Sequence, residues 1–188
     1  MFPEILYEDN HIIVAVKPPN IPVQADESGD LDMLTMLKGY IKEKYNKPGN
    51  VFLGLCHRLD RPVGGVMVFA RTSKAAQRIT DQFAKKQAHK KYAAVVCGKA
   101  KPHKRLECFM KKDEKTFSSY ICSESTPGAK SAILNYRCTA KKGDLSLLDI
   151  DLKQADIIRS ECNFRENACL FTAITVIILH LLMIPAQT

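Results

Sequence analysis

Residues 57–70, HRLDRPVGGVMVFA, constrain this chain more than any other segment. A histidine, two arginines and Asp60 fall within five positions, and a proline and two glycines follow them. Proline and adjacent glycines favour a turn, and the apolar run 66–70 favours a buried strand. The segment therefore places one carboxylate beside two cations on a turn that leads into the core. Turns of this kind often carry catalytic side chains.

The rest of the chain mixes strand and helix signals. Helical spacing predicts one helix over 31–45, capped by Asp30 or Asp32, and a second over 73–85, capped by the Thr-Ser pair at 72–73. Strands are predicted at 5–7, 11–16, 66–70, 92–97, 106–110, 117–122, 129–138 and 145–152. This order predicts an α+β fold, with a mixed or antiparallel β-sheet and flanking helices.

The distribution of charge favours a polyanionic partner. The chain has a formal net charge of +8, and residues 71–105 contain eleven basic residues and a single acid, Asp81. The charge of +10 in this window exceeds that of the whole chain, so the remainder is slightly acidic. Concentrated basic charge is typical of a nucleic-acid-binding surface, and a merely solvated basic face is the alternative.

The cysteines and the apolar C-terminal stretch bear on location. Seven cysteines are scattered without a C-x-x-C pair, and no secretory signal opens the chain. This usage favours a cytoplasmic protein whose cysteines are small core residues, and no zinc-type spacing predicts a metal site. The apolar residues 169–184 are shorter than the roughly 20 residues that span a bilayer, so a membrane anchor is not expected.

Three segments, in collinear order, resemble the RluA-type RNA pseudouridine synthases. ILYEDNHIIVAVKPPNIPV (5–23) resembles the first strand pair and Lys-Pro loop of that family. HRLDRPVGGVMVFARTSKAA (57–76) resembles its aspartate motif, and KKYAAVVCGK (90–99) the segment that carries its tyrosine. The resemblance implies isomerisation of uridines in structured RNA, ribosomal or transfer, without a cofactor. Residues 1–153 are then a pseudouridine synthase-like catalytic domain, expected to be monomeric and to bind RNA without an S4-like domain.

The resemblance assigns roles to five residues. Asp60 is the nucleophile, and Tyr92 packs on the uracil and assists removal of its C5 proton. Arg58, which fills the space of the flipped base or holds a phosphate, forms the substrate-binding set with His57 and Arg61. The residues alone leave other roles open: Asp60 as a turn aspartate paired with Arg58 or Arg61, Tyr92 as a core aromatic, and His57 as a structural hydrogen-bonding group.

Two departures from the family pattern qualify this expectation. Gly64 stands where relatives often carry serine, which loosens the turn. After Lys153, relatives continue with a segment similar to TGRHHQIRVQF, whose first arginine pairs with the catalytic aspartate, whereas this chain reads QADIIRSECNF. Restoring one adenine to an adenine run after codon 153 converts the second string into the first. Residues 154–188 are therefore interpreted as an out-of-frame hydrophobic tail, in which Arg159 does not replace the family arginine.

Loss of that arginine predicts impaired isomerisation and leaves two alternative functions open. The first is a catalytically inactive RNA-binding module of the same fold, against which the retained Asp60 and Tyr92 argue. The second is a membrane-associated protein that uses residues 169–184, against which the shortness of that stretch argues.

Overall fold

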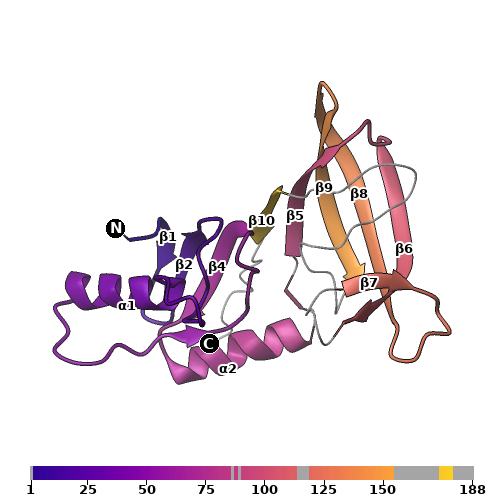
Figure 1. Ribbon diagram of the computed structural model, residues 1–188. Helices are drawn as coiled ribbons and strands as arrows, with labels where there is room; N and C mark the ends of the chain where they lie inside the picture. Colours follow the sequence, from indigo (N-terminus) through magenta and orange to yellow (C-terminus); the bar gives the residue numbers. More distant parts are fainter. Residues whose placement is uncertain (1, 86, 89, 114–118, 155–173, 180–188) are drawn as a thin grey trace. The chain divides into compact units, whose positions relative to one another are not determined.

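The structure, a computed structural model, describes residues 2–85, 87–88, 90–113, 119–154 and 174–179 (Figure 1). Two compact units make up the chain, one built on Met1–His89 and the other on Lys90–Ile178. The region predicted as one catalytic domain thus contains two units. Of the predicted tail (154–188), Gln154 and the strand β10 (Ile174–Leu179) are described, whereas Arg159 and the rest of 155–173 and 180–188 lie outside the described residues.

The first unit is an antiparallel sheet that carries two helices. Strands β1 (Ile5–Glu8) and β2 (Ile12–Lys17) pair, and β4 (Gly64–Ala70) pairs with β2 on one side and with the short β3 (Gly54–Leu55). Helix α1 (Met33–Lys44) follows β2, and α2 (Ser73–Ala84) follows β4. These elements confirm the predicted strands and helices and add β3.

Both helices begin at the side chains that the sequence indicated. Asp32 accepts a hydrogen bond from the Thr35 backbone at the start of α1, and Thr72 accepts one from the Ala75 backbone at the start of α2. Such caps satisfy backbone donors that have no partner within the helix.

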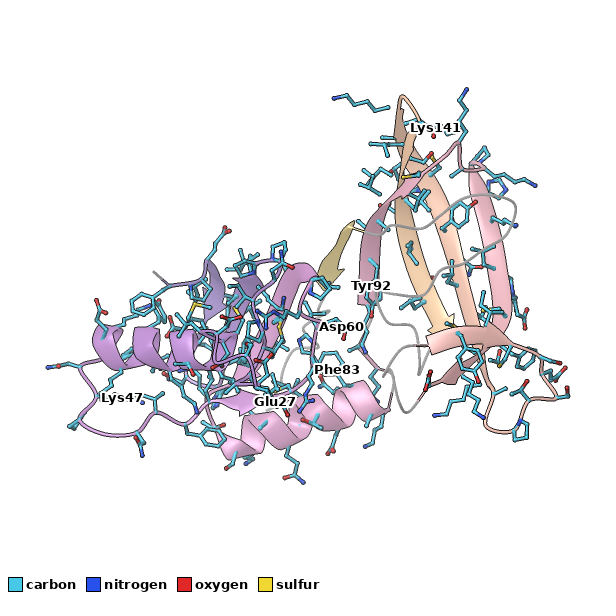
Figure 2. All side chains as sticks on the ribbon, viewed as in Figure 1. Glu27, Lys47, Asp60, Phe83, Tyr92 and Lys141 are labelled. Carbon is cyan, nitrogen blue, oxygen red and sulfur yellow. The ribbon has the colours of Figure 1, made fainter. Side chains whose placement is uncertain are left out.

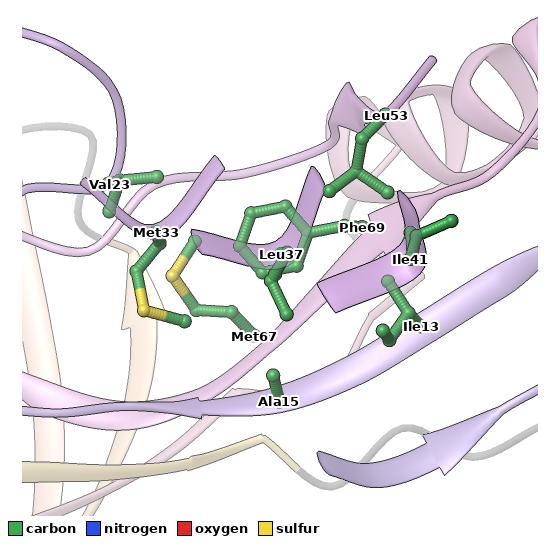
Figure 3. Packing of buried hydrophobic residues seen from close by; sticks show 9 residues of the cluster. All are labelled: Ile13, Ala15, Val23, Met33, Leu37, Ile41, Leu53, Met67 and Phe69. Atoms are coloured by element: carbon green, nitrogen blue, oxygen red, sulfur yellow. The ribbon is translucent and has the colours of Figure 1, made fainter. Parts of the chain in front are cut away.

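Alternate residues of β4 face the two helices. Met67 and Phe69 join Leu37 of α1 in the main buried cluster of this unit, shown in Figure 3, whereas Ala70 packs with Ala75 of α2. The alternation follows from the two-residue period of a strand. A Leu37→Ala change would create a cavity in the main cluster, which costs about 2–5 kcal/mol.

A nearly buried carboxylate ties the first strand to both helical regions. Glu8 accepts hydrogen bonds from Lys44 (2.8 Å), Tyr40 (3.0 Å), Tyr45 (2.8 Å) and Arg71 (3.0 Å). Burial raises the pKa of Glu8, but the bonds from Lys44, Tyr45 and Tyr40 outweigh it and hold the pKa below its ordinary value. Arg71 also lies over the Tyr45 ring, with 10% of its side chain exposed. Arg71, the first member of the basic window, is therefore part of an internal ion pair.

The second unit is a longer antiparallel sheet in the order β5-β9-β8-β6-β7. Its strands are β5 (Lys90–Cys97), β6 (His103–Lys112), β7 (Ser119–Cys122), β8 (Lys130–Lys142) and β9 (Leu145–Gln154). They confirm the strands predicted from the sequence, and residues 117 and 118 of one prediction lie outside the described part of the chain. Together with the described pairings of the first unit, this sheet confirms the predicted α+β fold.

One face of this sheet is apolar, and a serine side chain binds the backbone of the connection that follows β5. Leu106, Leu134 and Leu148 from three strands form its buried cluster, together with Val96 and Tyr136. Ser146, 1% exposed, donates its hydroxyl to the Gly98 carbonyl (2.7 Å) and accepts from the Ala100 backbone (3.1 Å). The hydroxyl therefore fixes the connection that leaves β5.

A search of the described residues finds no helix long and apolar enough to cross a membrane.

Candidate active site

Asp60 opens a tight turn between β3 and β4. The Val63 backbone donates to the Asp60 carbonyl (3.0 Å), so Arg61 and Pro62 occupy the two central positions of the turn. The Asp60 side chain is exposed, whereas the residues after Pro62 are buried as they enter β4. The predicted turn is thus present, and it presents its carboxylate at the surface of the first unit.

A buried lysine binds the backbone of this turn. Lys17, the last residue of β2, is 0% exposed, and its Nζ donates to the carbonyls of Arg61 (3.0 Å), Val63 (2.6 Å) and Pro18 (3.0 Å). Burial lowers the pKa of Lys17 to about 8, although the Asp60 carboxylate opposes this effect; the charge of Arg61 adds to it. The ammonium therefore links the inner strand to the turn that carries Asp60.

The Lys-Pro loop packs closely on the other end of the turn. The Asn20 backbone donates to the Arg61 carbonyl (2.7 Å), and Asn20 adopts a positive φ of 65°. A Cβ added to Gly64 would lie 3.1 Å from two ring carbons of Pro19. Position 64 therefore has little room for a side chain beside Pro19. This close packing opposes the loosening of the turn that was expected from Gly64.

The two arginines beside Asp60 contact an earlier loop. The guanidinium of Arg58 donates to Gln24 Oε1 (3.1 Å). Arg61 donates to Ser28 Oγ (2.9 Å) and forms ion pairs with Asp30 and with Asp26, the latter at 3.5 Å. Both arginines therefore contact residues of the loop 24–30. Both guanidinium groups belong to exposed residues.

His57 makes contacts that fix the start of the motif. Its Nε2 accepts a hydrogen bond from the Val68 backbone (3.1 Å), and its ring lies 4.7 Å from the ring of Phe83 of α2. A ring nitrogen that accepts from a backbone N–H is unprotonated. This geometry agrees with the structural hydrogen-bonding role that the sequence favoured for His57. Phe83 and Asp60 are labelled in Figure 2.

Tyr92 lies in the second unit, on β5. It is half-buried and stands in register with Ile150 of β9, which in turn pairs with Tyr136 of β8. Tyr92, Ile150 and Tyr136 therefore occupy adjacent positions across three neighbouring strands. Of the five predicted site residues, His57, Arg58, Asp60 and Arg61 share one segment of the first unit, and Tyr92 (labelled in Figure 2) belongs to the second.

Sequence reasoning missed the lysine and the loop that hold the motif. Lys17 was placed in the Lys-Pro loop after the strand predicted at 11–16, although Ile13, Ala15 and Lys17 alternate onto the buried face of β2. That two-residue period was the available signal. The partners of Arg58 and Arg61 lie more than 30 positions earlier in the chain, and the sequence carries no periodic signal for such contacts.

The chemistry available at this turn is that of an exposed carboxylate on a fixed backbone. A carboxylate held in this way can act as a nucleophile, and adjacent guanidinium groups suit phosphate. Across the part of the chain that the structure describes, no group of three or more His, Cys, Asp and Glu side chains could hold a metal ion.

Comparison with known proteins identifies the class to which this fold and turn belong. Residues 11–156 match the RNA pseudouridylate synthase family, and the chain belongs to that family. A solved human protein, RNA pseudouridylate synthase domain containing 4, superimposes with a TM-score of 0.64 at 22% identity, over 79% of this chain and 58% of that one.

Curated relatives extend this finding. An uncharacterized RNA pseudouridine synthase of Bacillus subtilis is 29% identical over 156 residues, which are 80% of this chain and 49% of that protein. Ribosomal large subunit pseudouridine synthase C of Escherichia coli is 33% identical over 99 residues, 53% of this chain and 29% of that protein. The chain thus spans half or less of the length of these relatives.

Proposed function

We propose that this chain contains the catalytic region of an RNA pseudouridine synthase, with Asp60 as its nucleophile. The observation that carries the proposal is the exposed carboxylate on a turn whose backbone is held by the buried Lys17 ammonium. Membership of the RNA pseudouridylate synthase family supplies the reaction class.

The proposed reaction rearranges one nucleoside without a cofactor. The N1–C1′ bond of uridine breaks, the uracil turns, and a C5–C1′ bond forms. The C5 proton leaves and N1 gains a proton, so atoms and charge balance with no redox change. Asp60 attacks either the ribose C1′ or the uracil C6 and forms a covalent intermediate. Tyr92 is proposed, on the family resemblance, to pack on the uracil and to assist removal of the C5 proton.

The proposed substrate is structured RNA, on the family resemblance. In such RNA a stacked uridine must leave its stack to meet a protein carboxylate. Extrusion costs on the order of a few kcal/mol and less in a loop. Arg58, two residues before Asp60, is proposed to fill the vacated space or to bind a phosphate. Exposed Lys74 and Arg78 on helix α2, and Lys85 directly after it, are proposed to contact the RNA backbone. Several relatives are named ribosomal large subunit synthases, so ribosomal RNA is the first substrate to test.

We propose further that residues after Lys153 are out of frame and that this impairs catalysis. The family match ends at residue 156, close to the point at which the sequence departs from the expected arginine segment. On the resemblance, that arginine pairs with Asp60. An RNA-binding protein without isomerase activity is the second candidate, and the departure after Lys153 is the observation that favours it.

Tritium release separates these functions. RNA transcribed with [5-³H]uridine releases tritium to water only when the C5–H bond breaks, so the assay follows the proposed chemistry directly. We expect slow release by this chain and faster release by the chain with one adenine restored after codon 153. Asp60→Asn, which preserves shape, should abolish release in both, whereas the control Asp81→Asn on α2 should not. Release that survives in Asp60→Asn would refute the nucleophile, and absence of release from both frames would favour the RNA-binding candidate.

Cytoplasmic location and a monomeric state are proposed from the sequence alone. Cell fractionation without detergent tests the first, and light scattering of the purified chain tests the second.

A further inference from the structure

The loop of residues 24–30, QADESGD, lies against the arginines that flank Asp60. We call it the acidic loop, since it carries Asp26, Glu27 and Asp30 and no basic residue. All of its residues are exposed. An acidic surface next to the nucleophile of an RNA-modifying protein repels the phosphates that must approach it.

Hydrogen bonds of Ser28 connect the carboxylate of Asp26, the backbone of Asp30 and the guanidinium of Arg61. Ser28 Oγ donates to Asp26 Oδ1 (2.5 Å), accepts from the Asp30 backbone (3.2 Å) and accepts from Arg61 (2.9 Å). The Ser28 backbone also donates to Asp26 Oδ1 (3.0 Å). The bonds from Ser28 hold the pKa of Asp26 below its ordinary value, so this carboxylate stays charged at neutral pH.

The ion pairs of Arg61 are exposed and can exchange. The side chains of Arg61, Asp26 and Asp30 are 41%, 43% and 53% exposed, and pairs this accessible are weak and screened by salt. A phosphate that reached Arg61 could replace the carboxylates with a comparable charge-assisted contact.

The backbone of Arg61 does not depend on these pairs. Its carbonyl already accepts from Lys17 and from the Asn20 backbone, so the turn that carries Asp60 stays in place when the guanidinium changes partner. The side chain of Arg61 is thus separate from the support of the nucleophile.

From these contacts we infer that the acidic loop is a specificity device: Asp26 and Asp30 occupy Arg61 until an RNA phosphate displaces them. The inference rests on the proposed function, since it takes RNA to be the ligand. RNA that makes few other contacts displaces the two carboxylates less readily and therefore binds more weakly. RNA that is held elsewhere on the protein delivers its phosphate at high local concentration and completes the exchange.

The test measures binding of a fluorescein-labelled 20-nucleotide oligouridine by anisotropy in 50 mM KCl. The double variant Asp26→Asn, Asp30→Asn should bind this weakly contacting RNA about fivefold more tightly, because two exposed pairs no longer compete for Arg61. The matched control Glu27→Gln removes a charge from the same loop but not from the ion pairs of Arg61, and it should change affinity by less than about twofold. In an Arg61→Gln background, the double variant should lose most of its effect.

Three results would overturn the inference. These are equal gains in Glu27→Gln and in the double variant, unchanged or weaker binding by the double variant, or a gain that persists in Arg61→Gln. Tritium release is measured on the same variants, each made both as this chain and with one adenine restored after codon 153. If no protein releases tritium while the binding results hold, the isomerase proposal fails and the exchange at Arg61 stands.

Discussion

Replacing Lys17 with methionine should destabilise the first unit and release the turn that carries Asp60. Methionine fills a similar buried volume, so the change mainly removes the ammonium group. The carbonyls of Pro18, Arg61 and Val63 then lose a charged donor, although the Arg61 carbonyl still accepts from the Asn20 backbone. A buried acceptor left without a partner costs about 1–3 kcal/mol, and relief from burying the charge offsets part of the sum. We expect a net loss of about 3 kcal/mol at pH 7.

The same residue predicts how stability changes with pH. Burial lowers the pKa of Lys17 from 10.5 to about 8, partly offset by the Asp60 carboxylate. Between pH 8 and 10.5 the unfolded chain therefore binds more protons at this group than the folded chain does. Below pH 8 Lys17 is protonated in both states, so its contribution to stability does not vary with pH; as the pH rises from 8 to 10.5, the lowered pKa adds to the free energy of unfolding. The full rise corresponds to about 3 kcal/mol.

Urea unfolding followed by circular dichroism at pH 7 to 10.5 measures both effects. The difference in the free energy of unfolding between the unchanged chain and Lys17→Met should widen above pH 8. The control Lys47→Met, at an exposed lysine labelled in Figure 2, should leave stability within about 0.5 kcal/mol. A Lys17→Met chain as stable as the original at pH 7, or a difference that does not vary with pH, would refute the reasoning.

Three further substitutions test the packing around the two units by the same unfolding measurement. Glu8→Gln should cost about 3 kcal/mol, because it leaves the nearly buried Arg71 without its carboxylate, and a loss below 1 kcal/mol would contradict that role. Ser146→Ala should cost about 1–3 kcal/mol, since the Gly98 carbonyl and the Ala100 backbone N–H lose their partner. An unchanged urea midpoint would contradict this role of Ser146. Gly64→Ser should destabilise this chain by about 1–3 kcal/mol through crowding against Pro19, and combining it with Pro19→Ala should recover most of the loss.

The sequence predicted the elements and the aspartate turn because their signals are local. The caps at Asp32 and Thr72, the alternation of β4 and the turn before it all depend on residues close together in the chain. The support of the turn was not predicted, because lysine is rarely buried and Lys17 stands at the end of a strand. Arg71 was assigned to a basic surface on charge alone, and only the fold brings it to Glu8.

The bonds that Lys17 makes have a consequence for how this family can vary. Its Nζ binds only main-chain carbonyls, at Pro18, Arg61 and Val63, so the side chains at positions 61 and 63 are not part of the anchor. On the proposed function, substitutions at these positions change RNA recognition while the backbone that carries Asp60 keeps its place. RNA preference and the position of the proposed nucleophile are thus set by different atoms of the same turn.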